Sequence, residues 1–295
     1  MLNQGEEIME YKLLALDLDG TVFNSRKEID METIQAIHDY KNRGGKVVIC
    51  SGRGPLSTKW VSETIGLNDQ IIAYNGALIQ EADGQLLSMS TFSQTGIQTL
   101  IEACESYDIY GHFYEGDTLL APERNEWNMN WIENNIPALS MSGGRQDSCE
   151  EYRKRCRVKQ IDNLRQYVNT EHPTILKFAA FGKEEGPFAE FTQYLLGVTN
   201  EFVVSSSMNF SNLEISPANT TKETSLNTLI NQLGMEWSEV AAIGDNFNDL
   251  DMLRSAGLGI AMGNAPAKVK KEANMVTTTN NELGVAKAIR MILEG

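Results

Sequence analysis

The chain has 295 residues and a formal net charge of −15 at pH 7. That length is enough for a large hydrophobic core and predicts two domains. The acidic charge argues against a general nucleic-acid binder or a protein that docks on anionic membranes, because both rely on a cationic surface.

The sequence also carries signals for the cellular compartment. The 4 cysteines form no Cys-x-x-Cys pair and are too sparse for a disulfide framework. Residues 1–10 lack the apolar segment of a signal peptide, and no apolar run is long enough to cross a bilayer. We therefore expect a cytoplasmic protein.

His38, His112 and His172 stand in no motif, so we expect neither a histidine base nor a histidine-rich metal site.

An apolar run at residues 13–16 predicts a buried strand, and two carboxylates follow it directly. Asp17 and Asp19 come first, and Gly20 and Thr21 complete the segment. Ligands of α/β proteins bind at the carboxyl edge of a parallel sheet, which is where we expect these side chains. Taken alone, the same residues also fit a strand followed by an ordinary Asp-Gly turn.

The next elements follow the pattern of a parallel sheet. Residues 30–42 predict a helix capped by Asp30, and residues 46–50 predict a second buried strand that ends at Ser51. Another helix and a strand at 70–74 come next. This alternation predicts a parallel sheet with right-handed crossovers.

The pattern changes between about residues 84 and 213, where strands and loops are longer and no strand ends in acids. An Asp-Gly pair at 83–84 predicts a hairpin there. We expect an inserted α+β cap at residues 85–212, with residues 1–84 and 213–295 as the core domain. The expected cap elements are helices at 96–107, 125–134 and 187–196 and strands at 110–114, 175–181 and 202–206. Residues 140–174 receive no assignment.

One basic segment of the insertion comprises Arg153, Lys154, Arg155, Arg157 and Lys159. Glutamates four residues before Lys154 and Arg155 give the spacing that stabilises exposed helices. We interpret the segment as a solvated helix face, and contact with a substrate's negative charge is the alternative.

The core pattern resumes after the insertion. The expected elements are a helix at 224–232, strands at 240–244 and 258–262, and a closing helix near 285–292. Lys222 stands just before the first of these helices. A polar segment with Asp245, Asn248 and Asp249 follows the first of these strands directly.

Four polar clusters therefore stand at strand or helix ends of one expected sheet. They are Asp17/Asp19/Thr21, Ser51, Lys222 and Asp245/Asn248/Asp249. Each alone has an ordinary explanation, such as a turn residue, an exposed lysine or acids at a helix start. Acidic metal ligands, a hydroxyl and a cation that converge on one edge match the requirements of phosphoryl transfer.

The order of these motifs resembles the Cof-type branch of the haloacid dehalogenase superfamily, which is mostly phosphatases. The matching segments are Asp-Leu-Asp-Gly-Thr at 17–21, Cys-Ser-Gly-Arg at 50–53, Lys222, and Gly-Asp-Asn-Phe-Asn-Asp at 244–249. Supporting matches are Tyr-Asn-Gly-Ala at 74–77 and Met-Gly-Asn-Ala-Pro at 262–266. The resemblance implies an α/β fold with a Rossmann-like parallel-sheet core and an inserted cap. One departure is Glu223, where the family usually has glycine after the motif lysine.

The resemblance also implies roles for the residues. Asp17 would be the nucleophile that forms an aspartyl-phosphate, and Asp19 the general acid and base. Mg²⁺ would be held by Asp17, the backbone carbonyl of Asp19, and Asp245, while Asp249 would bind the metal through water or orient Lys222. The residues that would hold the substrate phosphate are Thr21, Ser51, Gly52, Lys222 and Asn248.

We therefore expect a Mg²⁺-dependent phosphatase of a small phosphorylated metabolite: a sugar phosphate, a nucleotide or a cofactor phosphate. Two alternatives stay open, a phosphosugar mutase that uses the same aspartyl-phosphate and a non-catalytic phospho-ligand binding protein. A calcium loop from Asp17 to Glu28 is a weaker interpretation, because Val22 stands where that loop needs glycine.

Overall fold

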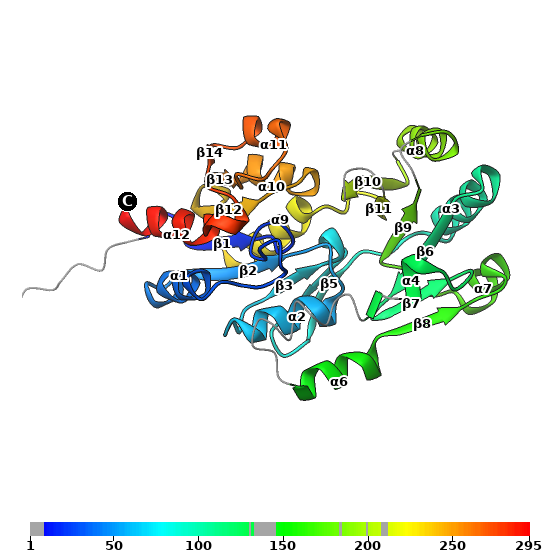
Figure 1. Cartoon of the computed structure of the whole chain (residues 1–295), viewed down its shortest axis with the longest axis horizontal. Coiled ribbons are helices and arrows are strands. Elements are labelled where there is room, and N and C mark those ends of the chain that lie inside the picture. The colour runs from blue at the N-terminus through cyan, green and yellow to red at the C-terminus, as the bar shows by residue number, and fades with distance from the viewer. Residues whose placement is uncertain (1–8, 130, 133–145, 183–184, 199, 208–211) are drawn as a thin grey trace, which may run out of the picture.

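The computed structural model describes residues 9–129, 131–132, 146–182, 185–198, 200–207 and 212–295. These residues form two sheets with helices around each (Figure 1). The expected α/β class with a parallel-sheet core is confirmed. No helix among the described residues is both long and apolar enough to span a bilayer.

The first sheet has, in the described part of the chain, the strand order β14-β13-β12-β1-β2-β3-β4-β5. It is parallel from β14 to β3, and the last two strands run antiparallel. Its strands are β1 (Leu13–Leu16), β2 (Lys46–Cys50), β3 (Ile71–Ala73), β4 (Leu78–Gln80), β5 (Leu86–Met89), β12 (Val240–Gly244), β13 (Leu258–Ala261) and β14 (Met275–Val276). The central strands β1 and β12 are buried on both faces of the sheet. Their sequences are therefore apolar throughout and do not alternate with polar residues.

Helices cover both faces of this sheet, as Figure 1 shows. One face packs against α1 (Met31–Asn42), α2 (Pro55–Thr64) and α12 (Gly284–Glu294). The other face packs against α9 (Lys222–Leu233), α10 (Leu250–Ser255) and α11 (Ala267–Glu272). The alternate side chains of β1 show the division, because Leu14 lies in the first apolar cluster and Leu13 in the second.

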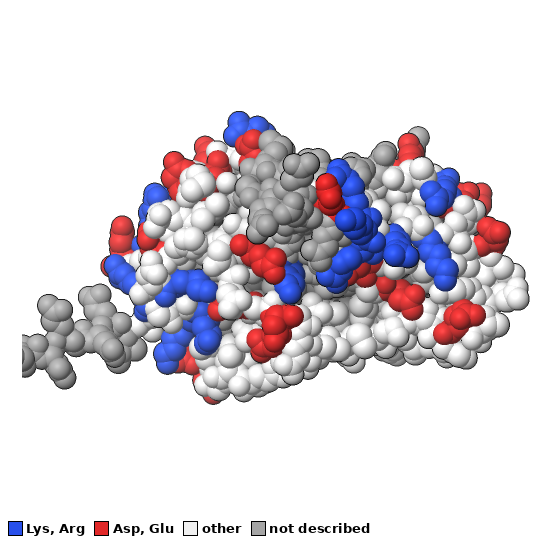
Figure 2. Space-filling view, turned by 90° about the horizontal axis from the view of Figure 1, so that it is seen from below, with Lys and Arg blue, Asp and Glu red and all other residues white. Residues whose placement is uncertain are grey.

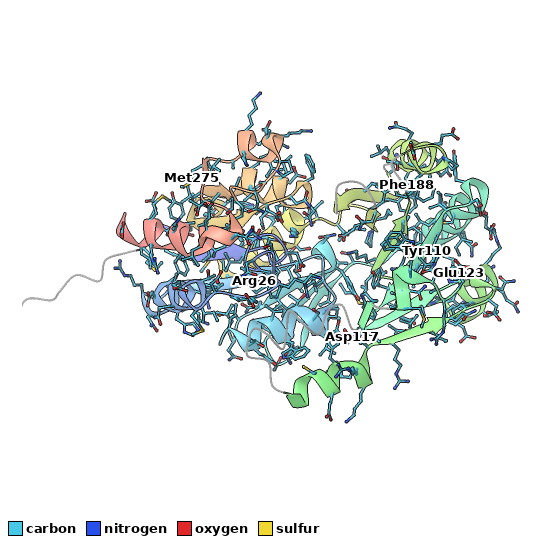
Figure 3. All side chains as sticks on the ribbon, viewed as in Figure 1. Arg26, Tyr110, Asp117, Glu123, Phe188 and Met275 are labelled. Atoms are coloured by element: carbon cyan, nitrogen blue, oxygen red, sulfur yellow. The ribbon has the colours of Figure 1, made fainter. Side chains whose placement is uncertain are left out.

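The second sheet belongs to the inserted segment and has, among the described residues, the order β10-β11-β9-β6-β7-β8. Its strands are β6 (Tyr110–Glu115), β7 (Thr118–Ala121), β8 (Arg157–Gln160), β9 (Lys177–Phe181), β10 (Phe202–Ser207) and β11 (Asn212–Pro217). An apolar cluster joins one face to α3 (Gln94–Tyr107), α7 (Leu164–Glu171) and α8 (Pro187–Gly197). Phe188 of α8, labelled in Figure 3, belongs to this cluster, far from the first sheet.

The strand pairing shifts both expected domain boundaries. β5 pairs with β4 in the first sheet, so the expected boundary at 84/85 falls inside the core hairpin. β11 pairs with β9 and β10 in the second sheet, so residues 213–217 belong with the cap rather than the core. The chain therefore crosses between the sheets at 90–93 and again at 218–221.

Other differences from the expected elements are local. The strand β7 was not expected, and the unassigned stretch contains α6 (Gln146–Arg155), β8 and α7. The expected helix at 125–134 is found as α4 (Glu126–Met129), while residues 130 and 133–145 lie outside the described part. Lys222 is the first residue of α9 rather than a residue before it.

Helix α6 of the insertion contacts the core, although its sequence reads as a solvated helix. Its charged residues Arg153, Lys154 and Arg155 are exposed, as expected. Figure 2 shows Lys and Arg side chains gathered on the face that carries α6. The opposite side buries Tyr152 against Trp60 of α2, with ring centroids 5.7 Å apart. The helix therefore joins cap and core through its apolar side.

Two hydrogen bonds add to this junction. The hydroxyl of Tyr74 donates to the carbonyl of Gly116 over 2.7 Å. The backbone N–H of Leu56 donates to Asp117 Oδ1 over 3.2 Å. Figure 3 labels Asp117 at the end of the cap that faces α2. The β6–β7 turn is thus fastened to the core in this arrangement.

Candidate active site

The carboxyl ends of β1, β2 and β12 lie at one level of the first sheet. Leu16 is paired with both Ile49 and Ile243, so the segments that follow begin side by side. The N–H of Asp17 continues this pairing by donating to the carbonyl of Ile243. The expected polar clusters therefore meet at one sheet edge, as the sequence predicts.

A buried lysine is the centre of the site. Lys222 Nζ lies 2.6 Å from Asp17 Oδ1 and 2.6 Å from Asp249 Oδ1, and all three residues are at most 5% exposed. Burial by itself would lower the pKa of Lys222, but the two carboxylates outweigh burial and raise that pKa. The lysine is therefore a fixed positive charge.

Local capping explains why Lys222 stands there. The hydroxyl of Thr221 accepts a hydrogen bond from the Thr224 N–H, and Thr224 Oγ1 accepts one from the Thr221 N–H. This reciprocal capping box begins α9 at Lys222. The first turn of the helix thus presents its cation to the sheet edge.

Three carboxylates crowd beside this cation. One oxygen from each of Asp17, Asp245 and Asp249 lies within 4.8 Å of the others. Desolvation, with the neighbouring acids adding to it and Lys222 opposing it, raises the pKa of Asp17 to about 7. Desolvation and the charges of Asp17 and Asp249 raise the pKa of Asp245 to about 8. An all-oxygen, electrostatically strained cluster of this kind fits a hard divalent cation such as Mg²⁺.

Asp249 is engaged on both of its oxygens. Oδ1 accepts from Lys222, and Oδ2 accepts from the N–H groups of Asp245 and Asn246, each over 3.0 Å. Asp249 is also fully buried. Of the two expected roles for Asp249, this geometry favours orienting Lys222 and the Asp245 loop.

Asp19 lies apart from the three-carboxylate cluster. Arg53 holds it with two hydrogen bonds, Nε to Oδ2 and Nη2 to Oδ1, each 2.6 Å long. Desolvation acts to raise the pKa of Asp19, but the charge and hydrogen bonds of Arg53 outweigh it and lower that pKa. The intervening Gly20 has φ of +83°, and a Cβ there would lie 2.3 Å from Asp245 Oδ2, so glycine is required.

The expected phosphate-binding residues gather around the same edge. Thr21 Oγ1 donates to Asp245 Oδ1 over 3.4 Å, and the buried Ser51 Oγ accepts from the Arg53 N–H over 3.1 Å. Asn248 Nδ2 donates to Asn75 Oδ1 over 3.0 Å. The structure thus places these three residues, Gly52 and Lys222 at the same edge of the sheet, and their binding of phosphate stays a prediction.

Several residues of the site were not singled out from sequence. Arg53, Asn75 and Asn264 stand in the matching motifs, so a local signal for them existed. Asn264 Nδ2 donates to the Gly20 carbonyl over 2.8 Å. Two cap residues also reach this edge: Lys177 Nζ lies 3.0 Å from the Gly52 carbonyl, and Glu214 Oε2 accepts from Asn75 Nδ2 over 2.7 Å. Their signal is weak: Lys177 is the first residue of the otherwise apolar β9, and Glu214 stands between two apolar residues of β11.

The unusual Glu223 is directed toward α10. Its Oε1 accepts a hydrogen bond from the Ser255 hydroxyl over 3.4 Å. Adjacent residues of a helix point in different directions, so Lys222 enters the site while Glu223 contacts the neighbouring helix.

Comparison with known proteins agrees with this geometry. The family model for haloacid dehalogenase-like hydrolases matches residues 14–289. Phosphatase YwpJ of Bacillus subtilis (strain 168) is 29% identical over 290 residues, covering 96% of this chain and 100% of that protein. The 5-amino-6-(5-phospho-D-ribitylamino)uracil phosphatase YcsE of the same organism is 29% identical over 284 residues, covering 96% of each. The solved structure of a haloacid dehalogenase-like hydrolase from B. subtilis matches with a TM-score of 0.80 and 27% identity, covering 95% of this chain and 99% of that one.

The family match spans nearly the whole chain, and the two curated relatives described above are named phosphatases. The motif residues also meet at one sheet edge around a buried lysine. The chain therefore belongs to the haloacid dehalogenase-like hydrolase family, as a Cof-type phosphoric monoester hydrolase.

Proposed function

We propose that this phosphatase hydrolyses a small phosphorylated metabolite with Mg²⁺ through an aspartyl-phosphate on Asp17. The observation that carries the proposal is the buried contact of Lys222 with both Asp17 and Asp249. It fixes one carboxylate beside a permanent cation at the edge where the other motif residues meet. Such an arrangement suits a nucleophile that attacks an anionic phosphoryl group.

In the first step, an Asp17 carboxylate oxygen forms a bond to phosphorus as the ester oxygen leaves. Asp17 Oδ1 accepts from Lys222, so we assign Oδ2 to the attack. Asp19 gives its proton to the leaving oxygen. In the second step Asp19 takes a proton from water, which attacks phosphorus, breaks the Asp17 bond and releases phosphate.

Arg53 sets a condition on this sequence. A carboxylate that accepts two hydrogen bonds from a guanidinium is held in its ionised form. Asp19 therefore cannot donate a proton in the described arrangement. We propose that substrate binding draws Arg53 from one Asp19 oxygen, so that this oxygen can carry the proton.

The remaining residues hold the phosphate and the metal. Thr21, Ser51, Gly52, Lys222 and Asn248 would bind the phosphate oxygens. Asp17, Asp245 and the Asp19 backbone carbonyl would hold Mg²⁺, whose charge would offset the negative charge on the transferred group. This local cation and Lys222 would attract a phosphate ester in spite of the chain's net charge of −15.

We propose that the second sheet and its helices form a cap domain that contacts the leaving group. The two crossings at 90–93 and 218–221 would act as the hinge. Closure would exclude water from the leaving-group side of the site.

The relative YcsE is named for a phosphate ester that carries a ribityl chain and a uracil ring. We include such sugar, nucleotide and cofactor phosphates in the proposed substrate class.

The proposed compartment is the cytoplasm, in agreement with the free state of all four cysteines.

The mutase alternative uses the same first step but returns phosphate to the sugar. The test is to incubate the purified full-length protein with a panel of phosphorylated metabolites and Mg²⁺, and to identify the products. Release of inorganic phosphate is expected. Isomerised sugar phosphate without phosphate release would show that the mutase alternative is correct.

A further inference from the structure

A buried ion pair of the cap reaches the phosphate-binding side of the core. Lys177 Nζ lies 2.9 Å from Glu214 Oε2, and their side chains are 6% and 15% exposed. They come from the neighbouring strands β9 and β11. We propose that Lys177 and Glu214 are positioning residues that order the phosphate-binding groups when the cap is closed. This inference rests on the phosphatase function proposed above.

The first contact of the pair is with the loop after β2. Lys177 Nζ donates to the Gly52 carbonyl over 3.0 Å. On the same loop the Arg53 N–H donates to Ser51 Oγ over 3.1 Å. Two hydrogen bonds therefore fix the peptide unit between Gly52 and Arg53. Lys177 of the cap binds its carbonyl oxygen, and Ser51 accepts from its N–H. Its orientation fixes where the Ser51 hydroxyl lies.

The glycine at this position allows the close contact. A Cβ on Gly52 would lie 3.0 Å from Asn75 Oδ1 and 3.1 Å from Glu214 Oε2. These distances are tighter than ordinary van der Waals contact. The cap carboxylate thus packs directly against the loop backbone, which a larger residue would push away.

The second contact of the pair is with Asn75 and, through it, Asn248. Glu214 Oε2 accepts from Asn75 Nδ2 over 2.7 Å, and Asn75 Oδ1 accepts from Asn248 Nδ2 over 3.0 Å. Asn75 is 3% exposed and has a φ of +55°, so its amide has little freedom. Glu214 fixes which end of this amide faces Asn248. The cap therefore determines the orientation of a second phosphate-binding side chain.

Electrostatics argues that this pair has a role besides joining the domains. A buried ion pair pays a desolvation cost that an apolar pair would avoid, so it is weak as a source of stability. Apolar contacts such as Tyr152 against Trp60 already join cap and core. The charged pair instead contacts Gly52 and Asn75, and Asn75 in turn contacts Asn248.

The test uses inorganic phosphate as the probe, because phosphate has no leaving group for the cap to contact. Binding to the full-length protein with Mg²⁺ is measured by calorimetry. Lys177→Met and Glu214→Gln are each expected to weaken phosphate binding about tenfold and to lower kcat/KM about 10- to 100-fold. The loss should be equal for p-nitrophenyl phosphate and for a natural ester. Lys177→Arg keeps a donor and a charge, so it should recover part of the binding.

Two controls make the outcome decisive. Lys159→Met removes an exposed cap lysine on β8 and should leave phosphate binding unchanged. The double variant Lys177→Met/Glu214→Gln leaves no unpaired buried charge, so it can be measured if a single variant does not fold. Unchanged phosphate binding in the folded variants, with losses confined to particular esters, would overturn the proposal and assign the pair to the leaving group. Wild-type protein that binds phosphate but releases none from any ester would contradict the proposed function instead.

Discussion

Arg53 donates two parallel hydrogen bonds to Asp19, with Nε to Oδ2 and Nη2 to Oδ1 both 2.6 Å. The guanidinium is mostly buried and lies 4.9 Å from the Phe23 ring centroid, while the Asp19 side chain is 54% exposed. An ion pair with an exposed partner adds little stability. The contact therefore positions Asp19 before the substrate binds and contributes little to holding the fold together.

The first prediction concerns this pair. Arg53→Lys is expected to lower kcat about tenfold or more, because an ammonium group cannot make the two-pronged contact that orients the Asp19 carboxylate before the substrate binds. The melting temperature should stay close to that of the wild type. Steady-state kinetics with Mg²⁺ and thermal unfolding measure the two effects. Arg254→Lys, at an exposed ion pair of α10, is the matched control and should not change kcat. A wild-type kcat in Arg53→Lys would show that Asp19 needs no such orientation.

The second prediction concerns the nucleophile. Asp17→Asn is expected to abolish phosphate release, because an amide oxygen is too weak a nucleophile to form the acyl phosphate. The amide still offers an oxygen to Lys222, so the protein should fold. Phosphate release and circular dichroism provide the measurements. Asp251→Asn changes an exposed acid nearby and should retain full activity. Activity within a few-fold of wild type in Asp17→Asn would rule out the nucleophile assignment.

The third prediction concerns the metal. EDTA should remove activity and Mg²⁺ should restore it, because the crowded carboxylates of Asp17 and Asp245 need a cation. Mg²⁺ should also stabilise the fold, by about 2.7 kcal/mol at a hundredfold excess over its Kd. Thermal unfolding with and without Mg²⁺ measures this shift. Asp245→Asn should lose most of the shift. Full turnover in EDTA would disprove the metal assignment.

The fourth prediction concerns His112 of the cap, which lies between the hydroxyls of Tyr110 and Tyr114 at 2.9 Å each. Figure 3 labels Tyr110 within this sheet. Burial, with the charge of Lys177 adding to it, lowers the pKa of His112 to about 3. The unfolded chain has an ordinary histidine pKa near ~6.5, so it binds more protons than the folded chain between those values.

Above pH ~6.5, His112 is neutral in both the folded and the unfolded chain, so it does not reduce the free energy of unfolding. As the pH falls below that value, the unfolded chain binds a proton that the folded chain does not, and the free energy of unfolding falls. The free energy of unfolding should drop by roughly 2 kcal/mol from pH 7 to pH 5 through this group alone. His112→Gln, which can bond both hydroxyls without titrating, should lack that part of the drop. Urea unfolding at the two pH values measures it. Equal drops in both proteins would show that His112 is protonated in the folded state.

The fifth prediction concerns the junction of cap and core. Tyr152→Ala should lower the free energy of unfolding by about 3 kcal/mol, because it removes a buried ring from the contact with Trp60. Lys154→Ala, on the exposed side of the same helix, should change it by less than about 0.5 kcal/mol. Chemical denaturation of the full chain compares them. Similar losses for both variants would mean that the α6 contact does not stabilise the fold.

The sequence by itself determined the core sheet and the location of the site. The strands β1, β2 and β12 are short apolar runs that end in polar residues, and this pattern is local. In a parallel sheet, the carboxyl ends of neighbouring strands must meet at one edge. The meeting of Asp17, Ser51 and Asp245 therefore followed from chain order and strand direction alone, whereas Lys222 comes from the start of helix α9.

Only the tertiary structure decided which sheet the border strands join and which side chains pair. The expected boundaries put residues 85–89 in the insertion and residues 213–217 in the core, but hydrogen bonding assigns β5 to the core sheet and β11 to the cap sheet. Lys177 is 125 residues from Gly52 in the chain, and Glu214 is 139 residues from Asn75. Neither has a local sequence pattern that names its partner. Strand register and the packing of two domains bring these groups within hydrogen-bonding distance, and those are properties of the folded chain as a whole.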